Sequence, residues 1–320
     1  MRKAARRIIH GLLLLAGVSI LSFALLDAAP GNFFDELRLN PQVSSSTVAA
    51  LRRQYGMNSS MPVRYWRWLE SVARGEFGYS LSYNRPVGEL IWPRARNTLL
   101  LTTLATSLAW LIALPWGIFE AMSCGGWIDR VGGVMTAILL AIPELLFGLL
   151  LLLLATRTGW FPVGGMASIP SGQETASMRI SDLALHLVLP VAGLVLGTAP
   201  ILVRHVRSAM AQVLGAPFID AARGQGIAPM RVVLRYALPV AANSLISLLG
   251  FSFGALLSMS LLIEVVLGWP GLGPLVLEAM LSRDIYVVIA AVMLSAVFLV
   301  VGNLLADVLL YFADPRIRTA

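Results

Sequence analysis

The chain has 320 residues, of which 58% are hydrophobic and 13% are charged, and its mean hydropathy is +0.79. Soluble domains carry about 25% charged residues, so this composition excludes a soluble globular protein and indicates a chain that exposes apolar surface to lipid. The single cysteine, Cys124, excludes an internal disulfide framework and a cysteine-based metal cluster.

Six apolar runs are long enough to cross a bilayer, which takes about 20 residues. They cover residues 8–26, 98–122, 131–154, 186–203, 238–267 and 287–311. Some contain proline, such as Pro143 in the third run, which membrane helices tolerate when neighbours satisfy the freed backbone groups. The sequence therefore predicts an all-α polytopic membrane protein with six transmembrane helices. The first run is too long for a cleaved signal peptide, so we expect an uncleaved signal anchor.

Basic residues predict the orientation, because they gather in cytoplasmic loops. Those assigned to the cytoplasmic side are Arg2, Lys3, Arg6, Arg7, Arg130, Arg204, Arg207, Arg223, Arg231, Arg235, Arg316 and Arg318. The short loops opposite hold only Arg157, Arg179 and Arg283. Both termini are therefore expected in the cytoplasm. The net charge of +7 follows from this topology and does not indicate nucleic acid.

The predicted order is a cytoplasmic N-terminus with the first helix (1–27), an external segment (28–96), a five-helix membrane core (97–312) and a cytoplasmic tail (313–320). In the external segment, Ser45 or Ser46 suits the N-cap of a helix over 47–55, and the apolar spacing predicts a second helix over 62–73. The segment is either a small cap packed on the membrane mouth or a docking surface for an external partner.

The loop 204–236 within the core has the composition of a short docking helix. Pro217 suits a first helical position, and Asp220 suits the first turn, where a carboxylate complements the helix dipole. The small Ala221 and Ala222 allow close approach of a partner, and Gly226 ends the helix. A stub of this shape fits a groove on a soluble protein, although a plain connecting loop also accommodates these residues.

Asp-Ala-Ala at 220–222, Gly226 and Leu-Pro at 238–239 resemble the EAA loop of bacterial ATP-binding-cassette importer permeases. In that family the loop docks on the nucleotide-binding subunit. The resemblance implies a coupling role for Phe218, Asp220, Ala221, Ala222, Arg223 and Gly226. Asp220 stands where the family usually has glutamate, and Tyr236 and Gln225 are further departures.

Other segments narrow the resemblance to permeases of the dipeptide, oligopeptide and nickel importers. They lie at 75–80, 160–164, 264–273 and 314–318, in the family's order. The resemblance implies the type I importer architecture in a bacterial inner membrane. It implies as partners a second homologous permease, two ATPase subunits or domains and an external solute-binding protein. Peptide is the first expectation for the cargo, with nickel, other metal chelates or glycosides behind it.

An ATP-binding P-loop needs a Gly-x-x-x-x-Gly-Lys-Ser/Thr motif. The only lysine of the chain is Lys3, so the motif is absent. We therefore expect a transport subunit that is not an enzyme and binds no cofactor itself, with ATP and Mg²⁺ hydrolysed by partner subunits.

Three residues in the predicted spans are candidates for the translocation path or gate. Glu144 lies in the third run, where an ionisable group is costly unless it faces protein or a water-filled cavity. It either lines the path or is a protonated side chain bonded to a neighbouring helix or subunit. Glu264 and Ser258 lie in the fifth run, whose small residues suit close helix packing.

Two other classes of protein share this span pattern. An ion-coupled secondary transporter predicts internal repeats and charged pairs at mid-membrane, and a lone Glu144 without an evident repeat counts against it. A non-transporting membrane assembly protein predicts no partner ATPase. Co-purification of a separate ATPase discriminates among the three.

Overall fold

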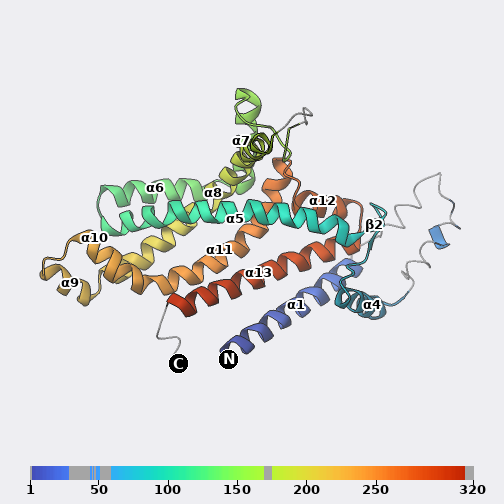
Figure 1. Ribbon diagram of the computed structural model, residues 1–320, viewed down its shortest axis with the longest axis horizontal. Coiled ribbons are helices and arrows are strands. Elements are labelled where there is room, and N and C mark those ends of the chain that lie inside the picture. Colours follow the sequence, from blue (N-terminus) through green and yellow to red (C-terminus); the bar gives the residue numbers. More distant parts are fainter. Residues whose placement is uncertain are drawn as a thin grey trace. The chain divides into compact units, whose positions relative to one another are not determined.

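The structure, a computed structural model, describes residues 2–28, 44, 46, 48–50, 59–168 and 175–313 (Figure 1). Within these residues the elements are helices apart from one short hairpin. In chain order they are α1 (Arg2–Ala28), α4 (Met61–Ala73), β1 (Tyr79–Ser80), β2 (Arg85–Pro86), α5 (Val87–Met122), α6 (Trp127–Ala141), α7 (Glu144–Thr158), α8 (Ala176–Leu214), α9 (Pro217–Gly224), α10 (Pro229–Val232), the π-helix η1 (Val233–Ala237), α11 (Leu238–Val266), α12 (Leu272–Leu281) and α13 (Ile285–Ala313).

The chain divides into two compact units. Unit 1 comprises residues 1–98 and 270–300, and unit 2 comprises residues 99–269 and 301–320. The boundaries predicted from the sequence, at 27, 96 and 312, mark the ends of expected membrane crossings. The two units are instead groups of residues that contact one another, so the two sets of boundaries do not correspond. The predicted helix over 47–55 lies mostly outside the described residues, as does the predicted tail 313–320.

Five of the described helices, or six if α6 and α7 count as one broken span, are long and apolar enough to cross a membrane. This agrees with the predicted all-α membrane fold of six spans. The helices extend beyond the apolar runs because a hydropathy pattern marks only the lipid-facing part of a helix. For example, α8 begins ten residues before the run 186–203 and continues to Leu214.

The prediction that 131–154 is one continuous span is wrong. The chain bends by 90° between α6 and α7. Ile142 has extended backbone angles (φ −85°, ψ 121°), and Pro143 precedes the first residue of α7. A proline disfavours the helical conformation of the residue before it and lacks the N–H that would continue the ladder. Pro143 therefore separates two helices.

Unit 1 contains the predicted amphipathic helix 62–73, observed as α4, which packs on α1 and on the first part of α13. Its Trp68 forms a buried cluster with Phe23 of α1 and Ile289 of α13. The ring centroids of Trp68 and Phe23 lie 5.2 Å apart. The Tyr65 hydroxyl lies 2.9 Å from the Ser19 hydroxyl. Contacts of the Phe23 ring with Trp68 and Tyr65, together with this polar contact, thus hold α4 against the first helix.

The β1–β2 hairpin of unit 1 is fastened by polar side chains. Asp284, which is 1% exposed, accepts hydrogen bonds from the Ser80 hydroxyl at 2.6 Å and from the Ser82 backbone N–H at 3.1 Å. Tyr83 donates to Glu278 of α12. These contacts join residues about 200 positions apart in sequence, so the hairpin is fixed by tertiary contacts.

Unit 2 is built around α8, which packs against α6, α7 and α11. Gly117 of α5 allows close contact with α8, since a Cβ there would lie 2.9 Å from the carbonyl oxygen of Val203. The indole N–H of Trp110 donates to the Ser252 hydroxyl of α11 at 2.9 Å. Small residues and a buried polar contact therefore bring these helices together, as membrane helix packing requires.

Candidate functional site

The helix α9 (Pro217–Gly224) confirms the predicted stub in the loop after α8. Pro217 occupies the first turn, where its missing N–H costs nothing, and Asp220 lies in the same turn. The helix ends at Gly224, and Gly226 adopts φ +75°, which L-residues other than glycine rarely take. The N–H of Gly226 donates to the carbonyl oxygen of Arg223 at 2.9 Å and closes the turn.

One face of α9 is fixed to unit 2 by apolar packing. Ile219 is fully buried and Ala222 is 6% exposed. Both belong to a cluster with residues of α8, α10 and η1, among them Met210, Val232 and Val233. Ala222 does not lie on the exposed face of α9, because helical geometry turns its methyl group toward the interior beside Ile219. Its small side chain lets α9 lie close to the rest of unit 2.

The opposite face of α9 is exposed and chemically mixed. Phe218 is 44% exposed, and Asp220, Ala221 and Arg223 are also exposed. The Arg223 guanidinium lies 3.5 Å from the Asp220 carboxylate, an exposed contact of little energetic weight. An exposed aromatic flanked by opposite charges suits a protein partner, since such residues dominate binding energy when they are buried by one.

The connection after α9 returns directly to a long helix. Gly226 is exposed, and Pro229 begins α10. A π-helical turn, η1, then joins α10 to α11. Figure 1 shows α9 and α10 together at one end of unit 2. A force applied to α9 therefore has a short covalent route into both α8 and α11.

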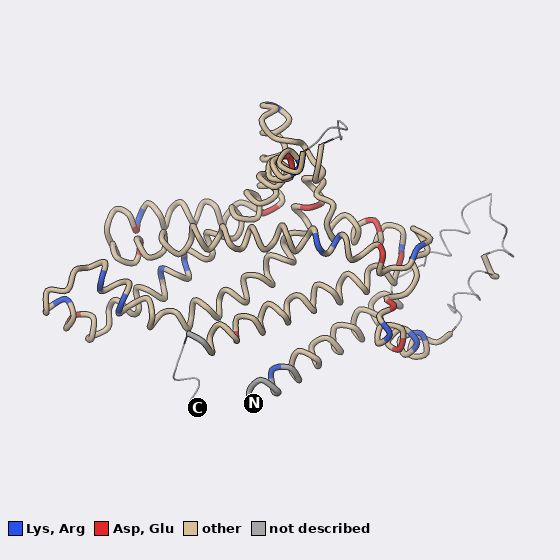
Figure 2. The backbone as a smooth tube through the Cα atoms, viewed as in Figure 1, with Lys and Arg blue, Asp and Glu red and all other residues tan. Residues whose placement is uncertain are grey.

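A polar cluster that the sequence reasoning missed joins α6 to α8 in unit 2. The Arg207 guanidinium donates to the two oxygens of Asp129 at 2.5 and 2.9 Å, and the Gly125 N–H donates to Asp129 at 2.8 Å. Nearby, the Glu120 carboxylate accepts a hydrogen bond from the indole N–H of Trp116 at 2.7 Å. A Cβ on Gly132 would lie 1.9 Å from Glu120 Oε1, so the Glu120 carboxylate lies directly against the backbone of α6. Figure 2 shows the charged segments of α9 and α10 at the end of unit 2.

The three path candidates lie in different surroundings. Glu144 is the first residue of α7 and half-buried, and its buried Oε1 has no hydrogen-bond partner among the described residues. Its Cγ would lie 3.8 Å from a Cβ on Gly197 of α8. Glu264 is fully buried within α11, whereas Ser258 on the same helix is exposed. Glu144 thus lies where α7 contacts α8, whereas Glu264 and Ser258 both lie on α11.

Two of the sequence motifs meet in unit 2. The N–H of Gly165 donates to the carbonyl oxygen of Gly268 at 3.1 Å. A Cβ on Gly164 would lie 3.3 Å from the carbonyl oxygen of Leu267, and Gly268 adopts φ +61°. Glycines therefore allow the segment after α7 to pack against the backbone after α11, beside the fully buried Trp269.

The described residues contain no group of three His, Cys, Asp or Glu side chains placed to hold a metal ion. His186 of α8 is buried, and its Nδ1 lies 2.8 Å from the carbonyl oxygen of Asp182, so this imidazole is packed within the helix bundle of unit 2.

Two family profiles together match most of the chain. One, described as binding-protein-dependent transport system inner membrane component, matches residues 113–319. The other describes the N-terminal part of such a membrane component and matches residues 1–102. The two matched ranges leave only a short stretch of α5 between them.

Curated relatives match over nearly their whole length. The chain is 37% identical to the oligopeptide transport system permease protein AppB of Bacillus subtilis, covering 98% of both chains. It is 32% identical to a putative peptide permease of Brucella suis, covering 99% of both, and 32% identical to the glutathione transport system permease GsiC of Salmonella typhi, covering 94% of both.

A solved structure has the same fold. An inward-facing conformation of the MetNI methionine ABC transporter matches with a TM-score of 0.57 and 18% identity, covering 70% of this chain and 96% of that one. The matched part of this chain therefore has the fold of a chain of that transporter.

Proposed function

Because the chain belongs to the family of binding-protein-dependent transport system inner membrane components, we propose that it carries peptides as one of two homologous permeases in an importer. The chain is a multi-pass permease subunit of the inner membrane in an ATP-binding-cassette importer. Its family has no ATPase activity and binds no cofactor, and ATP is hydrolysed by partner subunits. The transport system also includes a solute-binding protein.

Peptide cargo is supported by the relatives named above. Their names give oligopeptides, peptides and glutathione, which is itself a tripeptide. Full-length similarity to three such permeases favours a peptide over nickel, other metal chelates or glycosides. Competition for uptake by unlabelled peptides, by nickel and by glycosides tests this part of the proposal directly.

The observation that carries the coupling mechanism is the two-sided character of α9. Its buried face holds the helix to unit 2, while Phe218, Asp220, Ala221 and Arg223 are exposed. We assign these residues, with the Gly226 turn, to contact with an ATPase subunit. Ala222 lies on the buried face and helps to hold α9 in place for this contact. This assignment places α9 and both termini in the cytoplasm, in agreement with the distribution of arginines.

Glu144 is the candidate for contact with cargo. Its buried Oε1, which has no hydrogen-bond partner in the part of the chain that the structure describes, lies at the bend between α6 and α7 and would bind the ammonium group of a peptide. Ser258 is exposed and suits the path or the second permease, whereas the buried Glu264 acts as a structural part of a gate. Alternating access then follows from nucleotide binding, which shifts the equilibrium by its different affinity for two states of the complex.

The test is ATP-driven peptide uptake by proteoliposomes that contain both permeases and the ATPase subunits, with the solute-binding protein outside. Phe218→Ala should lower uptake by at least about tenfold, as expected for an aromatic at the centre of an interface. Phe119→Ala, an aromatic of comparable exposure (52%) outside α9, is the matched control. Equal uptake by the two variants would contradict the assignment of α9.

A further inference from the structure

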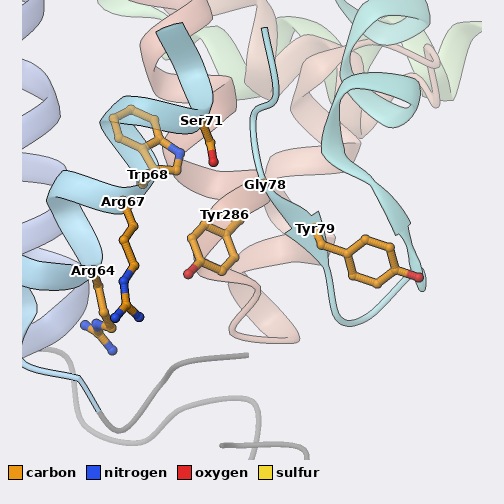
Figure 3. Close-up of a pocket in the computed structure, with 7 residues that line it drawn as sticks. All are labelled: Arg64, Arg67, Trp68, Ser71, Gly78, Tyr79 and Tyr286. Carbon is orange, nitrogen blue, oxygen red and sulfur yellow. The ribbon is translucent and has the colours of Figure 1, made fainter. Parts of the chain in front are cut away.

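Unit 1 contains a pocket of about 170 Å³, lined by one face of α4, the residue before β1 and the first turn of α13 (Figure 3). Its lining side chains with charge or hydrogen-bonding capacity include Arg64, Arg67, Trp68, Ser71 and Tyr286. None of the described residues that line it is acidic. The described lining therefore carries two guanidinium groups and further hydrogen-bond donors.

The walls of the pocket are fixed by packing. Gly78 adopts φ +100°, and a Cβ there would lie 3.1 Å from the Tyr286 ring, so the ring lies directly against the backbone before β1. Trp68 is held by Phe23 and Ile289 in the buried cluster of unit 1. A pocket with such walls keeps its shape before a ligand arrives.

One donor in the pocket lacks an acceptor. Trp68 is 4% exposed, and its buried indole Nε1 has no hydrogen-bond partner among the described residues. Figure 3 shows this nitrogen on the side of the ring that faces Ser71. Arg67 is exposed, and its guanidinium makes one long contact of 3.3 Å to the Ser59 hydroxyl. Guanidinium and indole groups only donate, so the matching ligand is an acceptor such as a carboxylate.

Asp284, the acidic residue of the hairpin contact, does not line the pocket. Its carboxylate already accepts from the Ser80 hydroxyl and the Ser82 N–H, and the residue is 1% exposed. These contacts engage the Asp284 carboxylate with the hairpin, and it makes no hydrogen bond to Arg67 or Trp68.

The sides of α4 indicate what approaches the pocket. Successive helix residues are rotated by about 100°, so residues two apart lie on opposite sides. Trp66 is 68% exposed opposite Arg64, and Leu69 is 38% exposed opposite Ser71. An amphipathic helix places its apolar flank in a membrane interface. The pocket on the other flank then faces water, which favours a soluble partner over a lipid headgroup.

We propose that this pocket receives an aspartate or glutamate side chain of the external solute-binding protein and thereby fixes how that protein docks. The inference rests on the proposed function, because it takes the binding protein as the partner. Its volume suits one side chain, since pockets for whole small ligands span about 300–1,000 Å³. The segment 28–96 holds nine arginines against five acidic residues, so the surroundings attract an acidic partner surface.

The test is the affinity of the solute-binding protein for the complete transporter in nanodiscs. Arg67→Gln removes one charge at an exposed position, and Trp68→Phe removes the indole N–H while keeping an aromatic ring. Each should weaken binding by at least about tenfold, as expected for loss of a hydrogen bond to a charged group. Arg74→Gln is the matched control, because Arg74 lies on α4 outside the pocket and pairs with Glu70 at 2.6 Å. It should change binding by less than about twofold.

Uptake separates this inference from the proposed function. Arg67→Gln should raise the concentration of binding protein that gives half-maximal uptake and leave the maximal rate unchanged. A wild-type complex without binding-protein-dependent uptake would refute the proposed function. Normal wild-type uptake together with wild-type docking by Arg67→Gln would refute the pocket inference alone.

Two further outcomes would assign the pocket to another occupant and overturn the inference. Arg67→Gln could dock the binding protein normally but change how free-acid and C-amidated peptides compete for uptake. The pocket would then bind the carboxylate of the cargo. If Arg67→Gln weakens docking only in nanodiscs of anionic lipid, the pocket would bind the phosphate of a lipid headgroup.

Discussion

The hairpin of unit 1 and the helix α9 of unit 2 are both small elements held on long helices, but by different chemistry. The hairpin directs the Ser80 hydroxyl and the Ser82 backbone N–H to the buried Asp284. In α9 the inward residues are Ile219 and Ala222, and the charged groups are exposed.

Because of this difference, we expect the polar groups of the hairpin to serve folding and the exposed groups of α9 to serve partner binding. Polar groups satisfied within the chain stabilise the fold and have no capacity left for another protein. The charged and aromatic groups of α9 have almost no such intramolecular role, so they remain available for a partner. Substitutions in the hairpin contacts should therefore act on stability, and those on the outer face of α9 should act on coupling.

The largest effect is expected for Asp284→Ala, which leaves the Ser80 hydroxyl and the Ser82 N–H without their acceptor. Two hydrogen bonds to a buried charge predict a loss of about 3–5 kcal/mol. Thermal unfolding of the detergent-solubilised transporter would measure it. Asp284→Asn, which keeps one acceptor oxygen, should lose less, and an alanine variant as stable as wild type would contradict the account of the hairpin.

The next effect is expected for Ile219→Ala on the buried face of α9. Deleting a fully buried isoleucine to alanine costs about 2–4 kcal/mol, and this should appear as faster amide hydrogen exchange in α9 as well as lower uptake. Phe218→Ala should lower uptake with unchanged exchange. If the two variants behave alike, the distinction between the faces of α9 fails.

A smaller effect is expected for Gly226→Ala. The site has open space for a methyl group, so the cost comes only from φ +75° and amounts to about 1–2 kcal/mol of local strain. Gly224→Ala is the matched control, since it also has open space and no positive φ. ATPase activity stimulated by binding protein should fall in the first variant and remain in the second. Asparagine at 226, which tolerates positive φ, should restore part of the loss.

The smallest effect concerns Tyr83, which lies outside the membrane spans. Burial, followed by its hydrogen bond to Glu278, raises the pKa of Tyr83 to about 12. The folded pKa exceeds the unfolded value of about 10, so this contribution to stability is present below pH 10 and is lost as the pH rises toward 12. Unfolding midpoints across this range should show a decline that Tyr83→Phe reduces. An unchanged decline would mean that other groups cause it.

Local chemistry was enough to predict several elements from the sequence. Proline at 217 and glycine at 226 predicted α9, and apolar spacing predicted α4 from 62 to 73. Six apolar runs predicted the membrane fold. In each case the signal lies within one continuous stretch of sequence, where propensity and periodicity act.

Features that depend on distant residues were not accessible in this way. The Asp129–Arg207 pair and the Ser80–Asp284 hydrogen bond join positions far apart in sequence. The burial of Ala222 depends on which side of α9 meets α8 and η1. Pro143 was visible in the sequence, but only the structure distinguishes a tolerated kink from a 90° bend between two helices.

The central claim is that the permease takes its energy from a separate ATPase through α9. The most direct measurement is vectorial uptake of labelled peptide by proteoliposomes with the solute-binding protein, with and without the ATPase subunits. We predict accumulation against a gradient only when the ATPase and ATP are both present. Accumulation of peptide in their absence, driven by an ion gradient, would contradict the claim.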